Sequence, residues 1–288
     1  MKVLVLGGGG QVGRAVTQSA PSAHQVHSKM RAELDIADDR AVAKLLAETK
    51  VDWIINTAAY TAVDRAEQQR GEAIAVNDTA VGVLARAAAR AGSRLLQLST
   101  DFVFDGTSSR AYLPADSTNP LSVYGVSKLG GERQVLQSGA AGIVLRTSWV
   151  YATAGRNFVL TMLRLMAERE QVRVVCDQIG APTWATSVAN AVWGLIDGNA
   201  PAGVHHWTDL GVASWYDFAV AIQEEAITRG LLKRAVPVVP ISSAEYPTPA
   251  KRPAFSVLNS ESTRALVSAP ALHWRQNLRK MLDELRTT

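Results

Sequence analysis

Residues 1–13, Met1-Lys2-Val3-Leu4-Val5-Leu6-Gly7-Gly8-Gly9-Gly10-Gln11-Val12-Gly13, run from an apolar segment directly into a row of glycines. The apolar run predicts a buried strand, and residues 11–19 have the pattern of a helix that Pro21 would stop. Gly7, Gly10 and Gly13 form the pattern G-x-x-G-x-x-G between the two. Glycines let a backbone turn tightly and approach a phosphate closely, while a helix that begins near Gln11 directs free N–H groups toward it. The stretch therefore predicts the first strand, loop and helix of a dinucleotide-binding fold.

Outward from this stretch, the first half of the chain alternates short apolar runs with helical patterns. We expect strands at residues 2–6, 25–28, 53–56, 94–99 and 142–146, and helices at residues 38–49, 73–91 and 124–137. Strands that alternate with helices indicate a parallel sheet with helices on both faces. The predicted fold class is therefore α/β, a Rossmann-type doubly wound parallel sheet.

The second half of the sequence is less regular. It predicts helices at residues 157–170, 185–196, 214–226 and 274–285, and a strand at residues 172–175. Between the last two helices six prolines favour loops over long central strands: Pro237, Pro240, Pro247, Pro249, Pro253 and Pro270. We expect residues 1–150 to form an NAD(P)-binding Rossmann domain, and residues 151–288 mostly a smaller substrate-binding lobe interwoven with it.

Composition narrows the class of protein. The 288 residues are 47% hydrophobic and 19% charged, which is typical of a globular chain. The net charge of +4 comes from scattered basic residues without a nucleic-acid-binding motif, so we expect no nucleic-acid partner. No apolar run reaches the length of a membrane helix or precedes a signal cleavage site, so we expect a cytoplasmic protein without a membrane partner. Cys176 is the single cysteine, and we expect it to be a small buried hydrophobe.

A candidate catalytic set follows the fourth predicted strand. Thr100 lies at its end in Ser99-Thr100-Asp101, and Tyr124-Gly125-Val126-Ser127-Lys128 comes downstream. A Tyr and a Lys four residues apart share one face of a helix. The ammonium of Lys128 is expected to lower the pKa of Tyr124, so that the phenol can donate a proton to a carbonyl oxygen while hydride reaches the carbon. Thr100 would orient the same oxygen, and Lys128 would also bind the nicotinamide ribose. The set predicts an oxidoreductase.

The residues after the second predicted strand bear on the choice of cofactor. Lys29 and Arg31 stand there, and no acidic residue does. Two cations can pair with a 2′-phosphate, which favours NADPH and leaves NADH possible. Two solvated surface cations would give the same pattern.

These motifs resemble those of the extended short-chain dehydrogenase/reductase family and, within it, of the dTDP-4-dehydrorhamnose reductases. The narrower resemblance rests on six segments in order along nearly the whole chain: residues 56–64, 99–106, 146–151, 157–158, 177–183 and 246–253 with 258–259. It implies reduction of the C4 ketone of dTDP-4-dehydro-L-rhamnose to dTDP-L-rhamnose, with hydride from NAD(P)H and a proton from Tyr124.

The resemblance also implies roles for single residues. Gly10, Gln11 and Val12 would touch the cofactor phosphates, beside Gly7 of the same loop. Further cofactor contacts are implied at Asp35 and Ile36 for the adenine, and at Ala59, Tyr60 and Thr61 after the third strand. Implied substrate contacts are Val63, Thr100, Asp101, Trp149 and Arg252, the last toward the diphosphate.

Departures from the family pattern leave alternatives open. Ala15 stands where some relatives carry a glutamate that bridges a dimer through magnesium, so we expect no bound metal; a homodimer is possible, but not one bridged by a metal ion. Epimerases and dehydratases of the superfamily share Tyr-x-x-x-Lys, but Asp101-Phe102 offers a single carboxylate where dehydratases have an acidic pair. Another nucleotide-sugar epimerase or reductase remains an alternative. So does a non-catalytic regulatory subunit like that of methionine adenosyltransferase.

Overall fold

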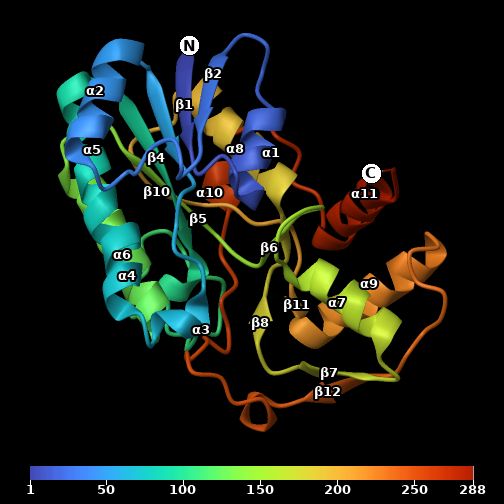
Figure 1. Cartoon of the computed structure of the whole chain (residues 1–288). Helices are drawn as coiled ribbons and strands as arrows, with labels where there is room; N and C mark the ends of the chain where they lie inside the picture. Colours follow the sequence, from blue (N-terminus) through green and yellow to red (C-terminus); the bar gives the residue numbers. More distant parts are fainter. Residues whose placement is uncertain (288) are drawn as a thin grey trace.

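A six-stranded parallel sheet forms the centre of the larger lobe in the computed structural model, which describes residues 1–287 (Figure 1). The strands lie in the order β10-β5-β4-β3-β1-β2, and every neighbouring pair is parallel. Their bounds are β1 Lys2–Leu6, β2 Gln25–Lys29, β3 Trp53–Asn56, β4 Arg94–Thr100, β5 Ile143–Thr147 and β10 Gly203–His206. The predicted doubly wound sheet is confirmed. Because β2 and β3 flank β1, the direction of strand addition reverses there, at the kind of point where α/β sheets bind ligands.

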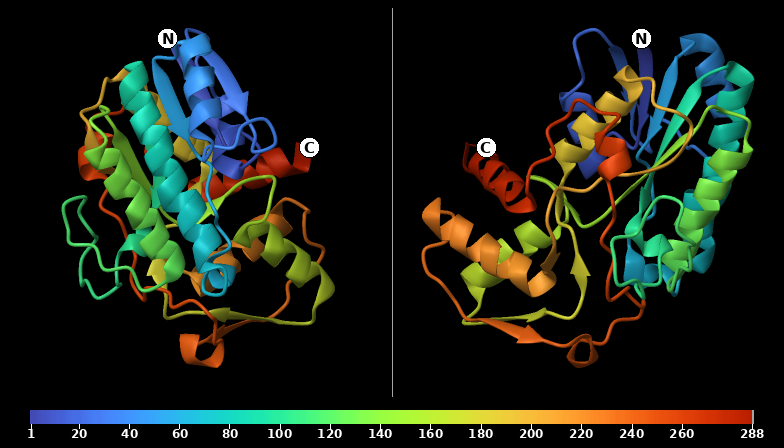
Figure 2. Two further views of the ribbon diagram at one scale, coloured as in Figure 1. Left: turned by 60° about the vertical axis from the view of Figure 1, so that its left-hand side comes forward. Right: turned by 180° about the vertical axis from the view of Figure 1, so that it is seen from behind.

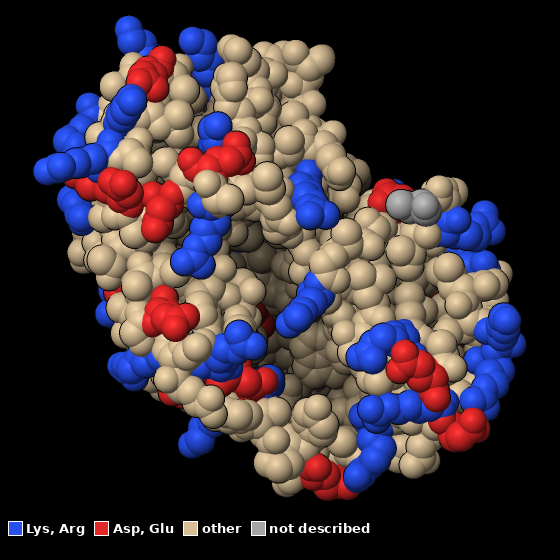
Figure 3. All heavy atoms as spheres, in the orientation of Figure 1, with Lys and Arg blue, Asp and Glu red and all other residues tan. Residues whose placement is uncertain are grey.

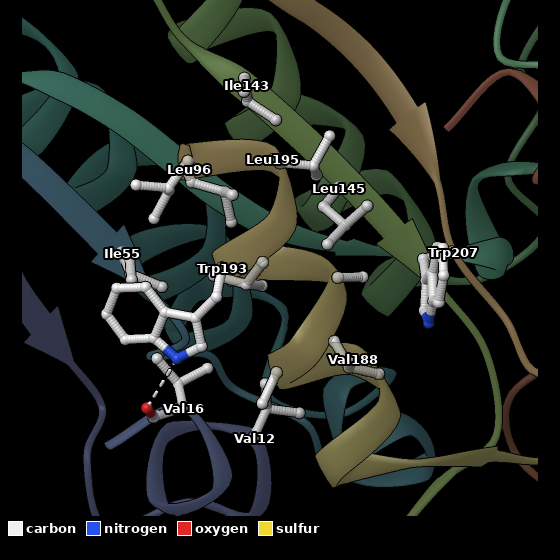
Figure 4. Close-up of a cluster of buried hydrophobic side chains, with 14 of the residues drawn as sticks. Val12, Val16, Ile55, Leu96, Ile143, Leu145, Val188, Trp193, Leu195 and Trp207 are labelled. Atoms are coloured by element: carbon white, nitrogen blue, oxygen red, sulfur yellow. Dashed lines mark hydrogen bonds between the residues drawn. The ribbon is translucent and has the colours of Figure 1, made fainter. Parts of the chain in front are cut away.

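Helices cover both faces of this sheet because its strands are apolar on both sides. Along β1, Val3 and Val5 pack toward α1 (Gln11–Gln18) and α8 (Ala185–Asp197), while Leu4 and Leu6 pack toward the opposite face. That face is covered by α2 (Asp39–Thr49), α5 (Ala80–Ala91) and α6 (Val123–Gln137). Figure 4 shows α8 against the sheet, where Trp193 Nε1 donates to the Val16 carbonyl of α1 over 3.1 Å.

The segment between β3 and α5 is more broken than the predicted helix 73–91. It contains α3 (Val63–Ala66), α4 (Arg70–Ile74) and a π-helical turn (Ala75–Thr79) that leads into α5. Single π-helical turns occur often at functional sites.

The smaller lobe packs three helices around an apolar core: α7 (Phe158–Glu168), α9 (Trp215–Thr228) and α11 (Trp274–Thr287). Short strand pairs surround them, β7 (Val172–Val175) with β12 (Val238–Ile241), β8 (Ile179–Gly180) with β11 (Ala213–Ser214), and β6 (Val150–Tyr151) with β9 (Thr183–Trp184). The remaining elements are α10 (Glu261–Arg264) and the 3-10 turns Asp101–Val103 and Ser243–Glu245. β12 is the strand of the proline-rich stretch, and it holds Pro240 in a sheet of only two strands.

The chain passes between the lobes more than once. α8 and β10 come after residue 150, yet both belong to the larger lobe, where β10 is an edge strand of the sheet. The view from behind in Figure 2 shows α8 lying beside α1, although the two are far apart in sequence. Within residues 1–287, no helix has the length and apolar character needed to span a membrane.

The expected burial of Cys176 is wrong. Cys176 is exposed, because it follows the short strand β7 at the surface of the smaller lobe. His205 and His206 of β10 are both buried, at 7% and 0% exposed. α10 covers this edge of the sheet, and the His206 N–H donates to Thr263 Oγ1 of that helix over 3.2 Å.

Candidate active site

The glycine loop approaches the neighbouring backbone so closely that side chains are excluded. Gly7 has a φ of +78°, and a Cβ there would lie 2.5 Å from the Ala58 nitrogen. A Cβ at Gly13 would lie 2.3 Å from the Gly7 carbonyl oxygen. Gly10 is the N-cap of α1 and offers no side-chain hydrogen bond, and the first turn of α1 holds no acidic residue. The free N–H groups and the positive dipole end of α1 are thus available to an anion.

Gln11 joins this loop to the smaller lobe. Its Nε2 donates to the Arg156 carbonyl over 3.2 Å, and Asn157 Nδ2 donates to its Oε1 over 3.1 Å. Asn157 also caps α7, since its Oδ1 accepts from the Leu160 N–H. The space-filling view shows a hollow between the two lobes with Lys and Arg side chains along its rim (Figure 3).

The end of β2 lies against the glycine loop, as a cofactor-discriminating segment should. The Lys29 carbonyl accepts from the N–H groups of Gly7 and Gly8 over 3.0 and 3.2 Å. Lys29 Nζ pairs with Glu33 at 3.3 Å, whereas Arg31 is exposed and has no ion pair among residues 1–287. Arg31 is therefore the freer of the two predicted cations.

The predicted adenine contacts behave differently from each other. Asp35 is exposed, and its Oδ1 accepts from the Ala37 N–H over 3.0 Å. The side chain of Ile36 is only 7% exposed and packs into the core beneath α2. A ligand can therefore reach the side chain of Asp35 far more readily than that of Ile36.

The loop after β3, with Ala59, Tyr60 and Thr61, is held by a residue that the sequence reasoning missed. Asn77 lies in the π-helical turn and is 1% exposed. Its carboxamide pairs with the backbone of Tyr60, accepting from the N–H over 2.8 Å and donating to the carbonyl over 3.0 Å. It also donates to Ser127 Oγ over 3.0 Å. Asn77 thus fixes this loop to the helix that carries Lys128.

Tyr124 and Thr100 are brought together at the carboxyl end of the sheet. Thr100 ends β4 and caps the following 3-10 turn by accepting from the Phe102 N–H over 3.2 Å. Tyr124 is half-buried in the first turn of α6, and its ring meets that of Phe102 edge to face, with centroids 5.5 Å apart. Gly125 permits this close approach, because a Cβ there would lie 2.3 Å from the Phe102 carbonyl oxygen.

The expected lowering of the Tyr124 pKa is not found. Burial raises the pKa of Tyr124 to about 12, and the negative charge of Asp101 adds to the rise, although a hydrogen bond with Thr100 opposes it. The ammonium of Lys128 does not offset this burial, since Nζ donates to the Leu98 carbonyl over 2.7 Å. The phenol is therefore held in its protonated form.

Lys128 is itself perturbed, because it is 4% exposed. Burial lowers the pKa of Lys128 to about 8, and the carboxylate of Glu132 partly offsets the fall. One turn further along α6, Glu132 forms a buried two-point ion pair with Arg146 of β5, at 2.9 Å to Nε and 2.6 Å to Nη2. Glu132 also accepts from Ser99 Oγ over 2.5 Å. This pair, which the sequence reasoning missed, locks α6 against β4 and β5 next to Lys128.

Asp101 places a carboxyl group beside Thr100 with one oxygen unused. Oδ1 accepts from Thr100 Oγ1 over 3.0 Å, whereas Oδ2 is buried without a hydrogen-bond partner in the described structure. Burial raises the pKa of Asp101 to about 6, while the neighbouring hydroxyls of Ser256 and Thr100 oppose the rise. A buried polar atom without a partner is the kind of group that a ligand can satisfy.

The other predicted substrate contacts lie on different segments. Trp149 follows β5 with a φ of +48°, and its half-buried indole stacks on Trp215. Val63 begins α3, and the next residue, Asp64, pairs with Arg252 through two contacts of 3.1 and 2.8 Å. Arg252 is thus engaged by a carboxylate where the resemblance implies a diphosphate. Trp215 was not foreseen.

Comparison with known proteins agrees with this geometry. The sequence model described as the RmlD substrate binding domain matches residues 1–287. The dTDP-4-dehydrorhamnose reductase of Burkholderia thailandensis is 42% identical over 285 residues, which are 96% of each chain. The crystal structure of a dTDP-4-dehydrorhamnose reductase from Clostridium acetobutylicum has a TM-score of 0.93 at 37% identity, covering 99% of this chain and 100% of that one. The dTDP-4-dehydrorhamnose reductase of Bacillus anthracis, solved in complex with NADP, has a TM-score of 0.92 at 32% identity, covering 98% of this chain and 99% of that one.

A match over nearly the whole chain settles the family. The chain belongs to the RmlD substrate binding domain family, as its sequence resemblance to the dTDP-4-dehydrorhamnose reductases predicted.

Proposed function

We propose that this chain reduces the C4 ketone of dTDP-4-dehydro-L-rhamnose to dTDP-L-rhamnose, with hydride from NADPH and a proton from Tyr124. The observation that carries the reaction type is the placement of Tyr124 of α6 against Thr100 at the carboxyl end of β4, the same edge of the sheet at which the glycine loop follows β1. The names of the full-length relatives support the choice of substrate. An exposed thiol, Cys176, fits the reducing cytoplasm that we propose as its location.

The glycine loop fits a dinucleotide. Gly7 and Gly13 let the loop pack tightly against neighbouring backbone, where a Cβ would clash, and the uncapped N-terminus of α1 suits a diphosphate. The Bacillus anthracis relative was solved with NADP, and the exposed cation Arg31, just after β2, would supply a partner for a 2′-phosphate. We propose NADPH as the preferred donor and NADH as the alternative. When bound, this cofactor supplies the hydride for C4.

Tyr124 and Thr100 act on the ketone oxygen. The hydroxyl of Thr100 orients that oxygen, and the phenol of Tyr124 donates its proton there. Because the pKa of Tyr124 is about 12, the phenol is protonated throughout the physiological range. The oxygen becomes strongly basic as C4 is reduced, so it can take a proton even from this weak acid. Lys128, whose ammonium the Leu98 carbonyl holds, would bind the nicotinamide ribose.

The substrate contacts belong to the same proposal. The unpartnered Oδ2 of Asp101 would accept from a sugar hydroxyl, and Trp149 would contact the sugar nucleotide beside Val63. Arg252 would bind the diphosphate only by exchanging its contacts with Asp64 for phosphate oxygens, which a guanidinium can hold in the same two-point geometry.

The alternatives differ in what happens to the cofactor. An epimerase would regenerate it in each turnover, and a regulatory subunit would not oxidise it. Purified protein, NADPH and dTDP-4-dehydro-L-rhamnose should give one dTDP-L-rhamnose per NADPH consumed, followed by the cofactor absorbance and by chromatography of the product. If the protein oxidises no NADPH and instead captures a methionine adenosyltransferase in stoichiometric amount, the proposed reductase function is wrong and the regulatory function takes its place.

Tyr124→Phe tests the proton donor. We expect kcat to fall by about 10²- to 10⁴-fold, the usual contribution of a general acid, while the NADPH dissociation constant stays the same. Tyr246→Phe is the matched control, since Tyr246 is 61% exposed and lies outside the candidate site. Near-normal turnover by Tyr124→Phe would assign the proton donor elsewhere.

A further inference from the structure

The indole of Trp215 lies flat against that of Trp149. The ring centroids are 3.5 Å apart and the planes differ by 4°. Trp215 is the first residue of α9, whose N-cap Ser214 and third residue Asp217 form a capping box. Both tryptophans are half-buried. The stack therefore lies at the surface of the smaller lobe, with Trp215 fixed by a well-capped helix start.

Trp149 occupies a strained backbone conformation. Its φ of +48° falls in the left-handed region, which bulky side chains rarely adopt. Such a conformation persists only when surrounding contacts hold it, and it clusters at ligand sites. The Trp149 carbonyl accepts from the Thr183 N–H over 3.2 Å. This hydrogen bond holds the backbone of Trp149, but the position of its ring depends on the side chains and backbone packed against it.

Gly180 packs closely against the same indole. A Cβ at Gly180 would lie 2.5 to 2.8 Å from three atoms of the ring, Cε2, Nε1 and Cζ2, so any side chain would displace it. Gly180 pairs with Ala213 in the β8–β11 ladder, two residues before Trp215. One short sheet thus places both neighbours of the Trp149 ring.

The indole N–H of Trp149 remains available. Across residues 1–287, no protein atom accepts a hydrogen bond from it, whereas Trp193, Trp207 and Trp274 each donate to a protein oxygen. An indole N–H beside apolar surroundings normally finds an acceptor. A sugar hydroxyl or a phosphate oxygen would supply one.

We propose that Trp215 is a positioning residue for the sugar-nucleotide site. Its ring and Gly180 fix the Trp149 indole in the strained conformation before substrate enters, so that the N–H and the edge of the ring already face the ligand. Trp215 acts through Trp149 and not by contact with substrate. The inference rests on the proposed function, because it takes Trp149 as the residue that meets the sugar nucleotide.

Trp215→Leu removes the stack and keeps an apolar side chain. We expect the dissociation constant of dTDP-L-rhamnose and the KM of the keto sugar to rise about tenfold, while that of NADPH stays within about twofold; tenfold equals about 1.4 kcal/mol. Trp215→Phe keeps a ring that can stack and should restore most of the affinity. Tyr216→Leu is the matched control, since it removes an aromatic ring from the same turn of α9 without touching Trp149.

A double-mutant cycle separates positioning from a general packing defect. If Trp215 acts through Trp149, Trp149→Ala and the double variant Trp149→Ala/Trp215→Leu should bind dTDP-L-rhamnose equally, since neither keeps a ring at position 149 for Trp215 to hold. Gly180→Ala offers an independent route, because its Cβ would push the same ring aside; a similar loss of affinity is expected there. If Trp215→Leu fails to fold, titrations of Trp215→Phe and Gly180→Ala with dTDP-L-rhamnose still test whether the position of the Trp149 ring determines affinity.

The outcomes distinguish the two proposals. Wild-type protein that binds no dTDP-L-rhamnose overturns the proposed function and this inference together. Wild-type binding with unchanged affinity in Trp215→Leu, or full additivity in the cycle, overturns the inference alone. Equal weakening of NADPH and sugar-nucleotide binding in Trp215→Leu also refutes it, since that result indicates loss of packing across the lobe.

Discussion

The burial of the charged Lys128 lowers the free energy of unfolding, and the variant Lys128→Met should reveal this loss. Burial lowers the pKa of this ammonium from 10.5 to about 8. At about 1.4 kcal/mol per pKa unit, the charged form is disfavoured by about 3 kcal/mol in the folded protein. Methionine matches the length of the lysine stem without its charge. It leaves the Leu98 carbonyl without its 2.7 Å hydrogen bond, which costs about 1–2 kcal/mol. The net expectation at pH 7 is a free energy of unfolding raised by about 1–2 kcal/mol, with reductase activity lost.

The advantage of Lys128→Met should depend on pH. At pH 7 the wild-type lysine is charged in both the folded and the unfolded state. Between about pH 8 and 10.5 the folded state releases the proton while the unfolded state still holds it, so wild-type stability rises with pH in this window. The Lys128→Met variant lacks this ionisable group, so its stability does not rise in the same way. The difference should therefore shrink above pH 8 and reverse by about pH 10, where only the lost hydrogen bond remains.

Urea unfolding followed by circular dichroism at pH 7, 8.5 and 10 measures this difference. Lys44→Met is the control, because the side chain of Lys44 is 77% exposed and its replacement should change stability by less than about 0.5 kcal/mol at any pH. A Lys128→Met variant that is less stable than wild type at pH 7 would refute the reasoning. So would a difference that stays constant across the three pH values.

Three further changes test the frame of the site. Gly13→Ala should abolish NADPH binding in calorimetry, because its Cβ would lie 2.3 Å from the Gly7 carbonyl oxygen; retained affinity would contradict the close packing of the loop. Arg146→Met should lower the free energy of unfolding by about 3–5 kcal/mol, since it leaves Glu132 buried and unpaired, and a loss below about 1 kcal/mol in urea would argue against the ion pair. Asn77→Ala should cost about 1–3 kcal/mol and also weaken NADPH binding, whereas an unchanged dissociation constant would show that the loop after β3 needs no such anchor.

Most elements of the larger lobe could be predicted from the sequence, because the patterns that indicate them are local. The glycine run after an apolar strand, and the alternation of strands and helices, depend on residues that are close in the chain. β1, β3 and β7 have the bounds that their apolar runs predict, and β2, β4 and β5 differ by no more than one residue at either end. The spacing of Tyr124 and Lys128 likewise needs only one helix.

The features that sequence reasoning missed depend on contacts between distant segments. Trp215 meets Trp149 although 65 residues separate them in the sequence, and no local pattern marks either as a stacking partner. In the sequence Arg146 is an ordinary residue of a predicted strand. Its ion pair with Glu132 becomes visible only when β5 and α6 are placed side by side. The pKa of Tyr124 was expected in the wrong direction because helix spacing shows that Lys128 is near but not that its ammonium binds Leu98. Burial then outweighs the neighbouring charge.

The late position of β10 and α8 in the chain bears on how the protein is synthesised. A ribosome that has released only residues 1–150 has produced five strands of the sheet, but not the strand that pairs with β5 or the helix that covers Val12 and Val16 of α1. The nascent chain would expose that apolar face until residue 206 emerges, and the smaller lobe would still lack α9 and α11. The larger lobe therefore cannot finish folding cotranslationally until part of the smaller lobe has been made. We infer that a break near residue 150 would yield two fragments that depend on each other to fold, in the manner of a split protein.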